Sequence, residues 1–123
     1  MDVSVYDDDW DVDLGDGHYL WWSIWAPDPE PNPWAADLPG PEDEPIGALI
    51  RHPKGPHPSG AYAQYSWCVG GVSFDTPRGR AFADRHPRPM WHVESLAPLT
   101  ISPSVLCGCG DHGFIRDGRW IRA

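Results

Sequence analysis

The chain has 123 residues and a mass of 13.7 kDa, which predicts a single small domain. It contains three cysteines and no apolar run of the roughly 18–20 residues that span a membrane, which excludes a disulfide scaffold and a transmembrane protein. The net charge of −9 is uneven, because residues 1–45 carry −13 and residues 46–123 carry +4. An acidic half of this kind repels phosphates, so we expect no nucleic-acid partner.

The composition favours a mainly β fold. The chain has 13 Gly and 15 Pro, which leave few windows for a long helix, while eight Trp and four Tyr can supply a core that is poor in aliphatic residues. Short alternating runs predict six to eight antiparallel strands in one domain. Within it we distinguish an acidic segment (1–17), a Pro-rich wrapping segment (26–45) and a metal-binding β core (61–123).

The first half of the chain contains two predicted strands. Residues 2–6 alternate between polar and apolar types, and residues 18–25 form the stronger candidate. Both faces of the second strand are apolar: Leu20, Trp22 and Ile24 share one, and Tyr19, Trp21 and Trp25 share the other. This pattern predicts a central strand, or a strand that is covered by the segment after it.

Proline occupies every second position from Pro27 to Pro33, which excludes a helix and removes the amide donors of a sheet. We expect residues 26–45 to wrap over the tryptophans of the preceding strand, with Trp34 as the anchor. Two alternatives stay open. The segment could be a ligand for another domain, or Trp21, Trp25 and Trp34 could form a surface that binds a peptide or a carbohydrate.

The second half predicts a series of short strands. Two of them are expected to meet at a turn formed by Val69, Gly70 and Gly71, and a short helical turn is expected within residues 82–88. Asp117 and Gly118 separate two short runs and predict a type I′ hairpin. The other expected strands are residues 45–51, 61–68, 72–75, 90–96 and 99–101.

The cysteines suggest a metal site. Cys107, Cys109 and His112 are close in sequence, and Gly108 and Gly110 permit a tight turn between them. With Cys68 as a fourth ligand they would form a Cys₃His zinc site that joins two distant parts of the chain.

Other arrangements of these residues stay open. His92 is the expected replacement if Cys68 is not a ligand, because it lies on the predicted strand nearest to the cluster. Cys68 could instead be a buried apolar residue, Cys107 and Cys109 a redox pair, or His112 a core histidine without metal. His52, His57 and His86 each precede proline and are expected in surface loops.

The C-terminal half resembles a small family from bacteria and their phages, catalogued as domain of unknown function 6527. The resemblance rests on residues 91–95, 99–106, 109–112, 114–115 and 118–120, and it covers about the last 60 residues. It implies a zinc-bound β domain without an established reaction. It also implies that Cys68 stands where the family has an upstream cysteine cluster, and that Cys107 supplies a missing ligand.

The expected function is that of a zinc-stabilised accessory or interaction protein without catalysis, in the cytoplasm of a bacterial host or in a virion. Its partner would be a protein or a second copy of the chain. Four protein ligands would leave zinc no open position for a substrate. The alternative is a zinc-dependent hydrolase with three protein ligands and a metal-bound water. In that case Asp111, otherwise expected to orient His112, or Glu94 would act as the base.

Overall fold

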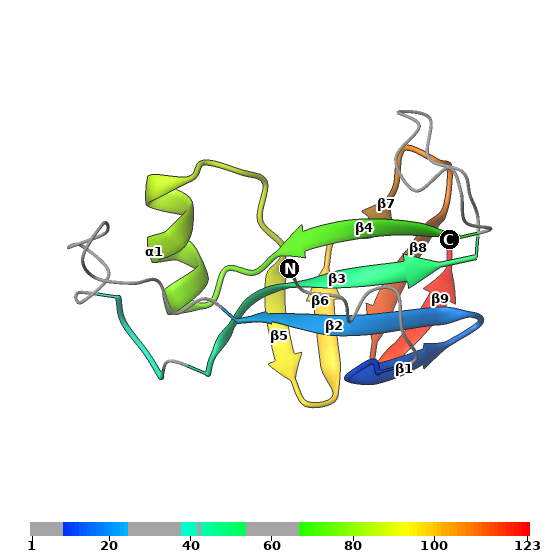
Figure 1. Ribbon diagram of the computed structural model, residues 1–123, viewed down its shortest axis with the longest axis horizontal. Coiled ribbons are helices and arrows are strands. Elements are labelled where there is room, and N and C mark those ends of the chain that lie inside the picture. Colours follow the sequence, from blue (N-terminus) through cyan, green and yellow to red (C-terminus); the bar gives the residue numbers. More distant parts are fainter. Residues whose placement is uncertain (1–8, 25–37, 42, 54–66) are drawn as a thin grey trace.

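The computed structural model describes residues 9–24, 38–41, 43–53 and 67–123 (Figure 1). These residues form one helix, α1 (Pro77–Arg85), and nine strands, so the prediction of a mainly β fold is confirmed. Within the described ranges, no helix is long and apolar enough to cross a membrane. The strands are β1 (Val12–Gly15), β2 (His18–Ile24), β3 (Pro45–His52), β4 (Cys68–Ser73), β5 (His92–Leu96), β6 (Leu99–Ser102), β7 (Val105–Leu106), β8 (His112–Arg116) and β9 (Arg119–Arg122).

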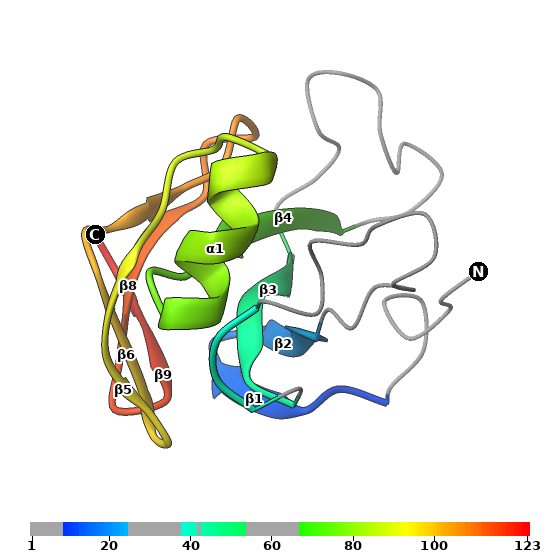
Figure 2. The same cartoon turned by 90° about the vertical axis from the view of Figure 1, so that its left-hand side faces the viewer.

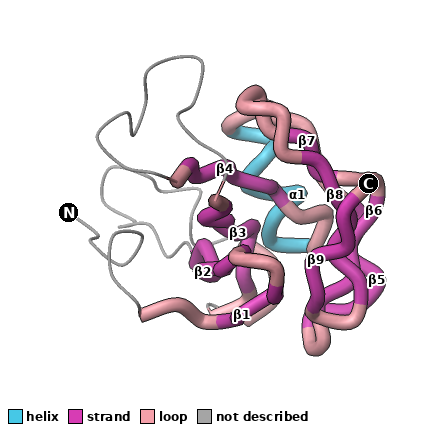
Figure 3. Tube along the Cα trace, turned by 90° about the vertical axis from the view of Figure 1, so that its right-hand side faces the viewer, coloured by secondary structure: helices cyan, strands magenta, loops and turns pink. Residues whose placement is uncertain are grey.

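The strands form two layers. Strands β1, β2, β3 and β4 pair in that order into an antiparallel sheet, and the second layer holds the β5–β6 hairpin and the three-stranded sheet β7–β8–β9. Figures 2 and 3 show the four-stranded sheet facing the smaller sheets, with α1 toward one end of the layers. Strand β4 is therefore an edge strand of the first layer, and the chain passes from it into the second.

The hydrophobic core lies between the two layers. Alternate residues of each strand point inward, so apolar side chains from the first sheet meet those from the smaller sheets. The first sheet contributes Leu14, Leu20, Ala48, Ile50 and Val72, Phe74 follows β4, and the second layer contributes Leu99, Ile101, Ile115 and Trp120. Phe74, Leu20 and Ile115 are completely buried, so the core extends across both layers.

The turn expected at Val69–Gly71 is wrong, because these residues lie within the continuous strand β4. Gly70 pairs with Ile50 and Gly71 with Leu49 across the ladder to β3. Two adjacent glycines suggest a turn in the sequence, but glycine inside a strand also marks a place where other atoms approach closely. A Cβ on Gly70 would lie 3.9 Å from the Cys107 sulfur, so the glycine adjoins the cysteine cluster.

The helix also differs from the expected turn within residues 82–88, because it begins earlier, at Pro77. The Thr76 side chain accepts a hydrogen bond of 3.0 Å from the Gly79 amide and thereby caps the helix. Proline is favoured at the first helical position, where no amide donor is needed. By contrast, the hairpin at Asp117 and Gly118 is confirmed, with positive φ angles of 51° and 72° between β8 and β9.

Several expectations concern residues outside the described ranges. These are the strand at residues 2–6, most of the Pro-rich segment 26–45, most of the strand at residues 61–68, the position of His57, and the roles assigned to Trp25 and Trp34. Trp21 is described, and its side chain is only 4% exposed. Its ring nitrogen donates a hydrogen bond of 2.7 Å to the Asp9 carbonyl oxygen, so Trp21 contributes to the packing of the first layer.

Candidate functional site

Four side chains converge into a group that could hold a metal ion. The ligand atoms of His52, Cys68, Cys107 and Cys109 all lie within 4.8 Å of one another. The sulfurs of Cys68 and Cys107 are 3.8 Å apart, and the Cys109 sulfur lies 3.1 Å from Nε2 of His52. All three cysteines are free thiols.

Both layers of the fold contribute to this group. His52 ends β3 and pairs with Cys68 at the start of β4, so these two ligands are cross-strand neighbours. Cys107 and Cys109 belong to the turn between β7 and β8. In that turn the Cys107 amide donates to the Asp111 carbonyl oxygen, and the Gly110 amide donates to the Cys107 carbonyl oxygen, both at 2.9 Å. An ion held here would fasten the first layer to the second.

A backbone contact orients His52, and burial raises the pKa of two of the thiols, those of Cys68 and Cys109. With a proton on Nδ1, His52 donates to the Ile50 carbonyl oxygen at 3.3 Å, and its Nε2 atom then faces the cysteine group with its lone pair. Burial and the neighbouring Cys107 raise the pKa of Cys68 to about 12. Burial also raises the pKa of Cys109, although the Asp111 amide donates to its sulfur. Metal binding must therefore displace protons from both thiols.

His112 lies outside this group and contacts a serine instead. Its Nε2 atom is 2.9 Å from Oγ of Ser104, the residue that precedes β7. His112 begins β8 and pairs with Leu106 across the ladder, which brings the histidine beside the segment that carries Ser104. The Trp91 ring nitrogen donates a hydrogen bond of 3.2 Å to the Ser104 carbonyl oxygen and thereby fixes the serine backbone.

Such a pair has the geometry of an activated nucleophile. When His112 carries its proton on Nδ1, its Nε2 accepts a hydrogen bond from the Ser104 hydroxyl, and the same nitrogen can take the hydroxyl proton. His112 is exposed and Ser104 is half-buried, so the pair is accessible. Among the described residues, no side chain bonds to Nδ1 of His112, so the contact involves only these two side chains.

Asp111 bonds neither to His112 nor to the cysteine group through its carboxylate. Its Oδ2 atom lies 2.7 Å from Nε2 of His18, which is 2% exposed. The His18 ring stacks on Trp120 with centroids 4.0 Å apart, and its Nδ1 contacts the Asp16 carbonyl oxygen at 2.8 Å. This bond fastens the β1–β2 turn to the residue before His112.

The remaining predicted ligand lies elsewhere. His92, the proposed replacement ligand, is 62% exposed and contacts Oδ2 of Asp75 at 2.9 Å. His52 is 3% exposed, so its expected position in a surface loop is wrong. The pairing of His52 with Cys68 could have been inferred from two antiparallel strands. The proximity of Ser104 and His112 could not have been inferred, because it depends on the pairing of β7 with β8, and β7 is too short to recognise in the sequence.

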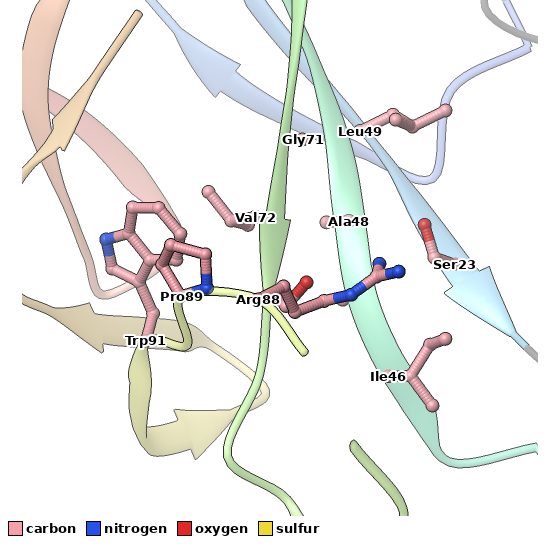
Figure 4. A pocket seen from close by; sticks show the side chains of 11 residues that line it. Ser23, Ile46, Ala48, Leu49, Gly71, Val72, Arg88, Pro89 and Trp91 are labelled. Atoms are coloured by element: carbon pink, nitrogen blue, oxygen red, sulfur yellow. The ribbon is translucent and has the colours of Figure 1, made fainter. Parts of the chain in front are cut away.

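Two hollows lie along β4. A cavity of about 50 Å³ is lined by Gly70 and Gly71 of β4 and by Trp91, Val105 and Leu106, among others. A second hollow, of about 330 Å³, shares Gly71 and Trp91 with the first. Figure 4 shows Pro89 and Trp91 beside β4, with Arg88 extending across the strand toward β3.

Comparison with known proteins assigns most of this region to one family. A family model described as bacterial ubiquitination-like system serine protease (BubE) matches residues 56–123, which is more than half of the chain. No match was found among curated proteins or among solved structures. The matched range includes both Ser104 and His112.

This finding corrects three expectations. The resemblance to domain of unknown function 6527 is replaced by the match to the BubE family. An accessory protein without catalysis is contradicted, because the family is described as a serine protease, and the same description contradicts a zinc-dependent hydrolase. The description names a bacterial system, so it gives no support to a phage origin.

Proposed function

This chain belongs to the BubE family of bacterial ubiquitination-like system serine proteases, and we propose that Ser104 and His112 are its nucleophile and its general base. The observation that carries this proposal is the 2.9 Å contact between Oγ of Ser104 and Nε2 of His112. A serine hydroxyl is a weak nucleophile on its own and needs a base within hydrogen-bond distance.

The reaction follows from these two side chains. Oγ of Ser104 attacks the carbonyl carbon of the substrate while Nε2 of His112 takes the hydroxyl proton. The carbon–nitrogen bond then breaks, and His112 gives that proton to the leaving amine, which leaves an acyl ester on Ser104. Water attacks the ester, His112 takes a proton from the water, and Ser104 leaves with that proton. The acid product and the free serine are thereby formed.

The substrate would be a protein of the bacterial ubiquitination-like system to which the family description refers. This assignment keeps a protein as the expected partner. The three free thiols fit a reducing compartment, so we place the protein in the bacterial cytoplasm.

We propose zinc as the ion bound by His52, Cys68, Cys107 and Cys109. Three sulfurs and one imidazole nitrogen are a common donor set for tetrahedral zinc. Two sulfurs at about 2.3 Å from one tetrahedral zinc lie roughly 3.8 Å apart, and the Cys68 and Cys107 sulfurs have this separation. Bound zinc would supply cross-linking between the two layers, while the bond-breaking chemistry stays with Ser104 and His112.

An alkyl fluorophosphonate probe tests the proposed dyad, because it phosphonylates an activated serine and needs no peptide substrate. The probe should label the wild-type protein at Ser104, as located by peptide mass spectrometry, and Ser104→Ala should abolish the labelling. Ser102→Ala is the matched control, because it removes a serine from the same segment and should leave the labelling intact. Labelling that persists in Ser104→Ala would contradict the proposal.

A further inference from the structure

A small apolar cavity lies beside the proposed nucleophile. It has a volume of about 50 Å³, its apolar wall is formed by Ile50, Trp91, Val105, Leu106 and Trp120 with the two glycines of β4, and His52, Cys107 and Asp111 complete the lining. Val105 directly follows Ser104, and Trp91 donates a hydrogen bond to the Ser104 carbonyl oxygen. Leu106 is 65% exposed, so the cavity wall reaches the surface. The segment 104–106 therefore carries the proposed nucleophile, Ser104, and also two residues that line the cavity, Val105 and Leu106.

The cavity exists because β4 lacks a side chain at one inward position. Alternate residues of β4 face the core, and Cys68, Val72 and Phe74 are buried there. Gly70 belongs to the same alternating set, and a Cβ at this position would contact Cys107 and His52 at 3.9 Å. These are ordinary contact distances, so an alanine would fit sterically and would occupy part of the cavity.

The backbone beside the cavity is open for pairing. The Phe74 amide donates to the Ile46 carbonyl oxygen, so Phe74, Val72 and Gly70 direct their backbone groups toward β3. The backbone groups of Ser73 and Gly71 therefore point outward. Ser73 accepts a hydrogen bond from the Trp91 amide, whereas the outward groups of Gly71 have no partner in the part of the chain that the structure describes.

The open edge continues into the larger hollow. The hollow of about 330 Å³ shares Gly71 and Trp91 with the smaller cavity, and Figure 4 shows both residues among those that line the hollow. Residues of β2 and β3 also line this hollow, so a peptide that pairs with β4 at Gly71 would lie between the small cavity and a depression that extends over the sheet. Extended peptides commonly bind in this way to an open sheet edge, through main-chain hydrogen bonds and alternating side-chain pockets.

We propose that the protein substrate binds as an added strand on the outer edge of β4, with a small apolar side chain in the cavity beneath Gly70. This inference rests on the proposed function and adds a substrate preference to it. A void of about 50 Å³ accepts a side chain of a few carbon atoms, such as that of alanine or valine, and is much smaller than a cavity of roughly 150 Å³ that binds benzene. Because Val105 lines the cavity and directly follows Ser104, we assign the small apolar side chain to the residue next to the cleaved bond.

Three peptidyl diphenyl phosphonates test this binding mode against the alkyl fluorophosphonate. The first carries an alanine side chain next to phosphorus, the second a phenylalanine side chain, and the third is the alanine probe with a methylated backbone amide. The measured quantity is the ratio of the peptidyl to the alkyl labelling rate at Ser104, which cancels changes in the reactivity of the serine itself. In the wild-type protein, the phenylalanine and methylated probes should each give a ratio at least tenfold below that of the alanine probe.

Gly70→Ala should lower the ratio for the alanine probe at least tenfold, because its methyl group enters the cavity. Ile121→Ala, a change on the exposed side of β9, is the control and should keep the wild-type ratio. The inference is overturned if Gly70→Ala keeps the wild-type ratio or if the phenylalanine probe matches the alanine probe. In either case, alkyl labelling of Ser104 leaves the proposed function standing. A complete lack of alkyl labelling removes the proposed function, and this inference with it.

Discussion

Nε2 of His112 and Oγ of Ser104 lie 2.9 Å apart, and the chain between these two residues carries Cys107 and Cys109. The turn that brings the histidine back to the serine is therefore the same turn that supplies half of the candidate metal group. Its conformation determines both the separation of the two proposed catalytic atoms and the convergence of the sulfurs. The two sites are mechanically linked, although they share no side chain.

The two histidines of this region should separate metal binding from reactivity. His52→Ala should lower the metal content, because it removes the nitrogen ligand, whereas His112→Ala should keep one metal ion per chain. His112→Ala should slow alkyl fluorophosphonate labelling of Ser104 by about 100-fold or more, which is typical for loss of a general base. Native mass spectrometry and labelling rates measure the two effects.

His92→Ala serves as the control for both measurements. This histidine is exposed and bonds to Asp75, outside the dyad and the cysteine group, so its loss should change neither the metal content nor the labelling rate. Loss of metal in His112→Ala, together with full metal content in His52→Ala, would restore His112 as the ligand and contradict the assignment of His52 to the metal group.

Removal of the metal should disturb the dyad through the turn. Treatment with a strong chelator should lower the melting temperature, because the ion no longer fastens the two layers. The labelling rate of Ser104 should fall in parallel, since the turn no longer holds His112 beside it. Added zinc should restore both quantities. A metal-free protein that keeps the wild-type labelling rate would show that the dyad does not depend on the metal group.

Gly113, the residue after His112, should tolerate no side chain. A Cβ at this position would lie 2.5 Å from two atoms of the Trp120 ring. Gly113→Ala must therefore displace the tryptophan or the start of β8, which we expect to destabilise the fold by about 1–3 kcal/mol and to slow labelling of Ser104. Urea unfolding and the labelling rate test this. Gly71→Ala is a stability control, because its nearest contact would be an ordinary 3.7 Å from Leu49.

The fold class was accessible from the sequence because strands leave local patterns. The short run of residues 45–51 and the Asp117–Gly118 pair predict a strand and a hairpin that the structure contains. The Gly70–Gly71 pair led to a wrong prediction, because glycine occurs both in turns and at strand positions where neighbouring atoms pack closely. Gly70 lies close to the Cys107 sulfur, and this proximity explains the glycine better than a turn does. Cys107 is 37 positions away in the sequence, so the residues around Gly70 give no sign of the contact.

The site was only partly predictable, for a similar reason. The chain has only three cysteines, and one shared metal ion would account for all of them. Their residue type therefore predicts that they lie close together, as they do in the structure. The choice between His52 and His112 depends on strand register, because His52 is placed by its pairing with Cys68. The Ser104–His112 contact likewise depends on a two-residue strand, and serine residues are too common to single out by type.

Asp75 should make the stability depend on pH in the acidic range. Burial alone would raise its pKa, but hydrogen bonds from His92 and the Val93 amide outweigh this effect and hold the pKa below its ordinary value of 3.8. A lowered folded-state pKa stabilises the fold above the unfolded-state pKa, and this contribution is lost as the pH falls through the folded-state value. The contribution of Asp75 to stability is therefore lost at pH values below about 4.

Urea unfolding of Asp75→Asn measures this contribution. The variant should lose less stability than the wild-type protein between about pH 5 and about pH 2, because it has no carboxylate to protonate at this position. Asp84→Asn is the control, since Asp84 is an exposed residue near the end of α1, and it should follow the wild-type curve. Identical pH dependence in Asp75→Asn and the wild-type protein would exclude a measurable contribution from Asp75.

The bond between His18 and Asp111 should contribute more to stability than an exposed ion pair. His18 is 2% exposed, so Asp111→Ala would leave its Nε2 atom buried without its 2.7 Å partner, at a cost of about 1–3 kcal/mol. His18→Phe retains a ring that can stack on Trp120 but carries no polar atom. In that background, Asp111→Ala should cost much less, and urea unfolding of the four proteins gives the coupling energy. Additive costs would mean that the bond contributes nothing and that Asp111 acts only through its backbone in the turn.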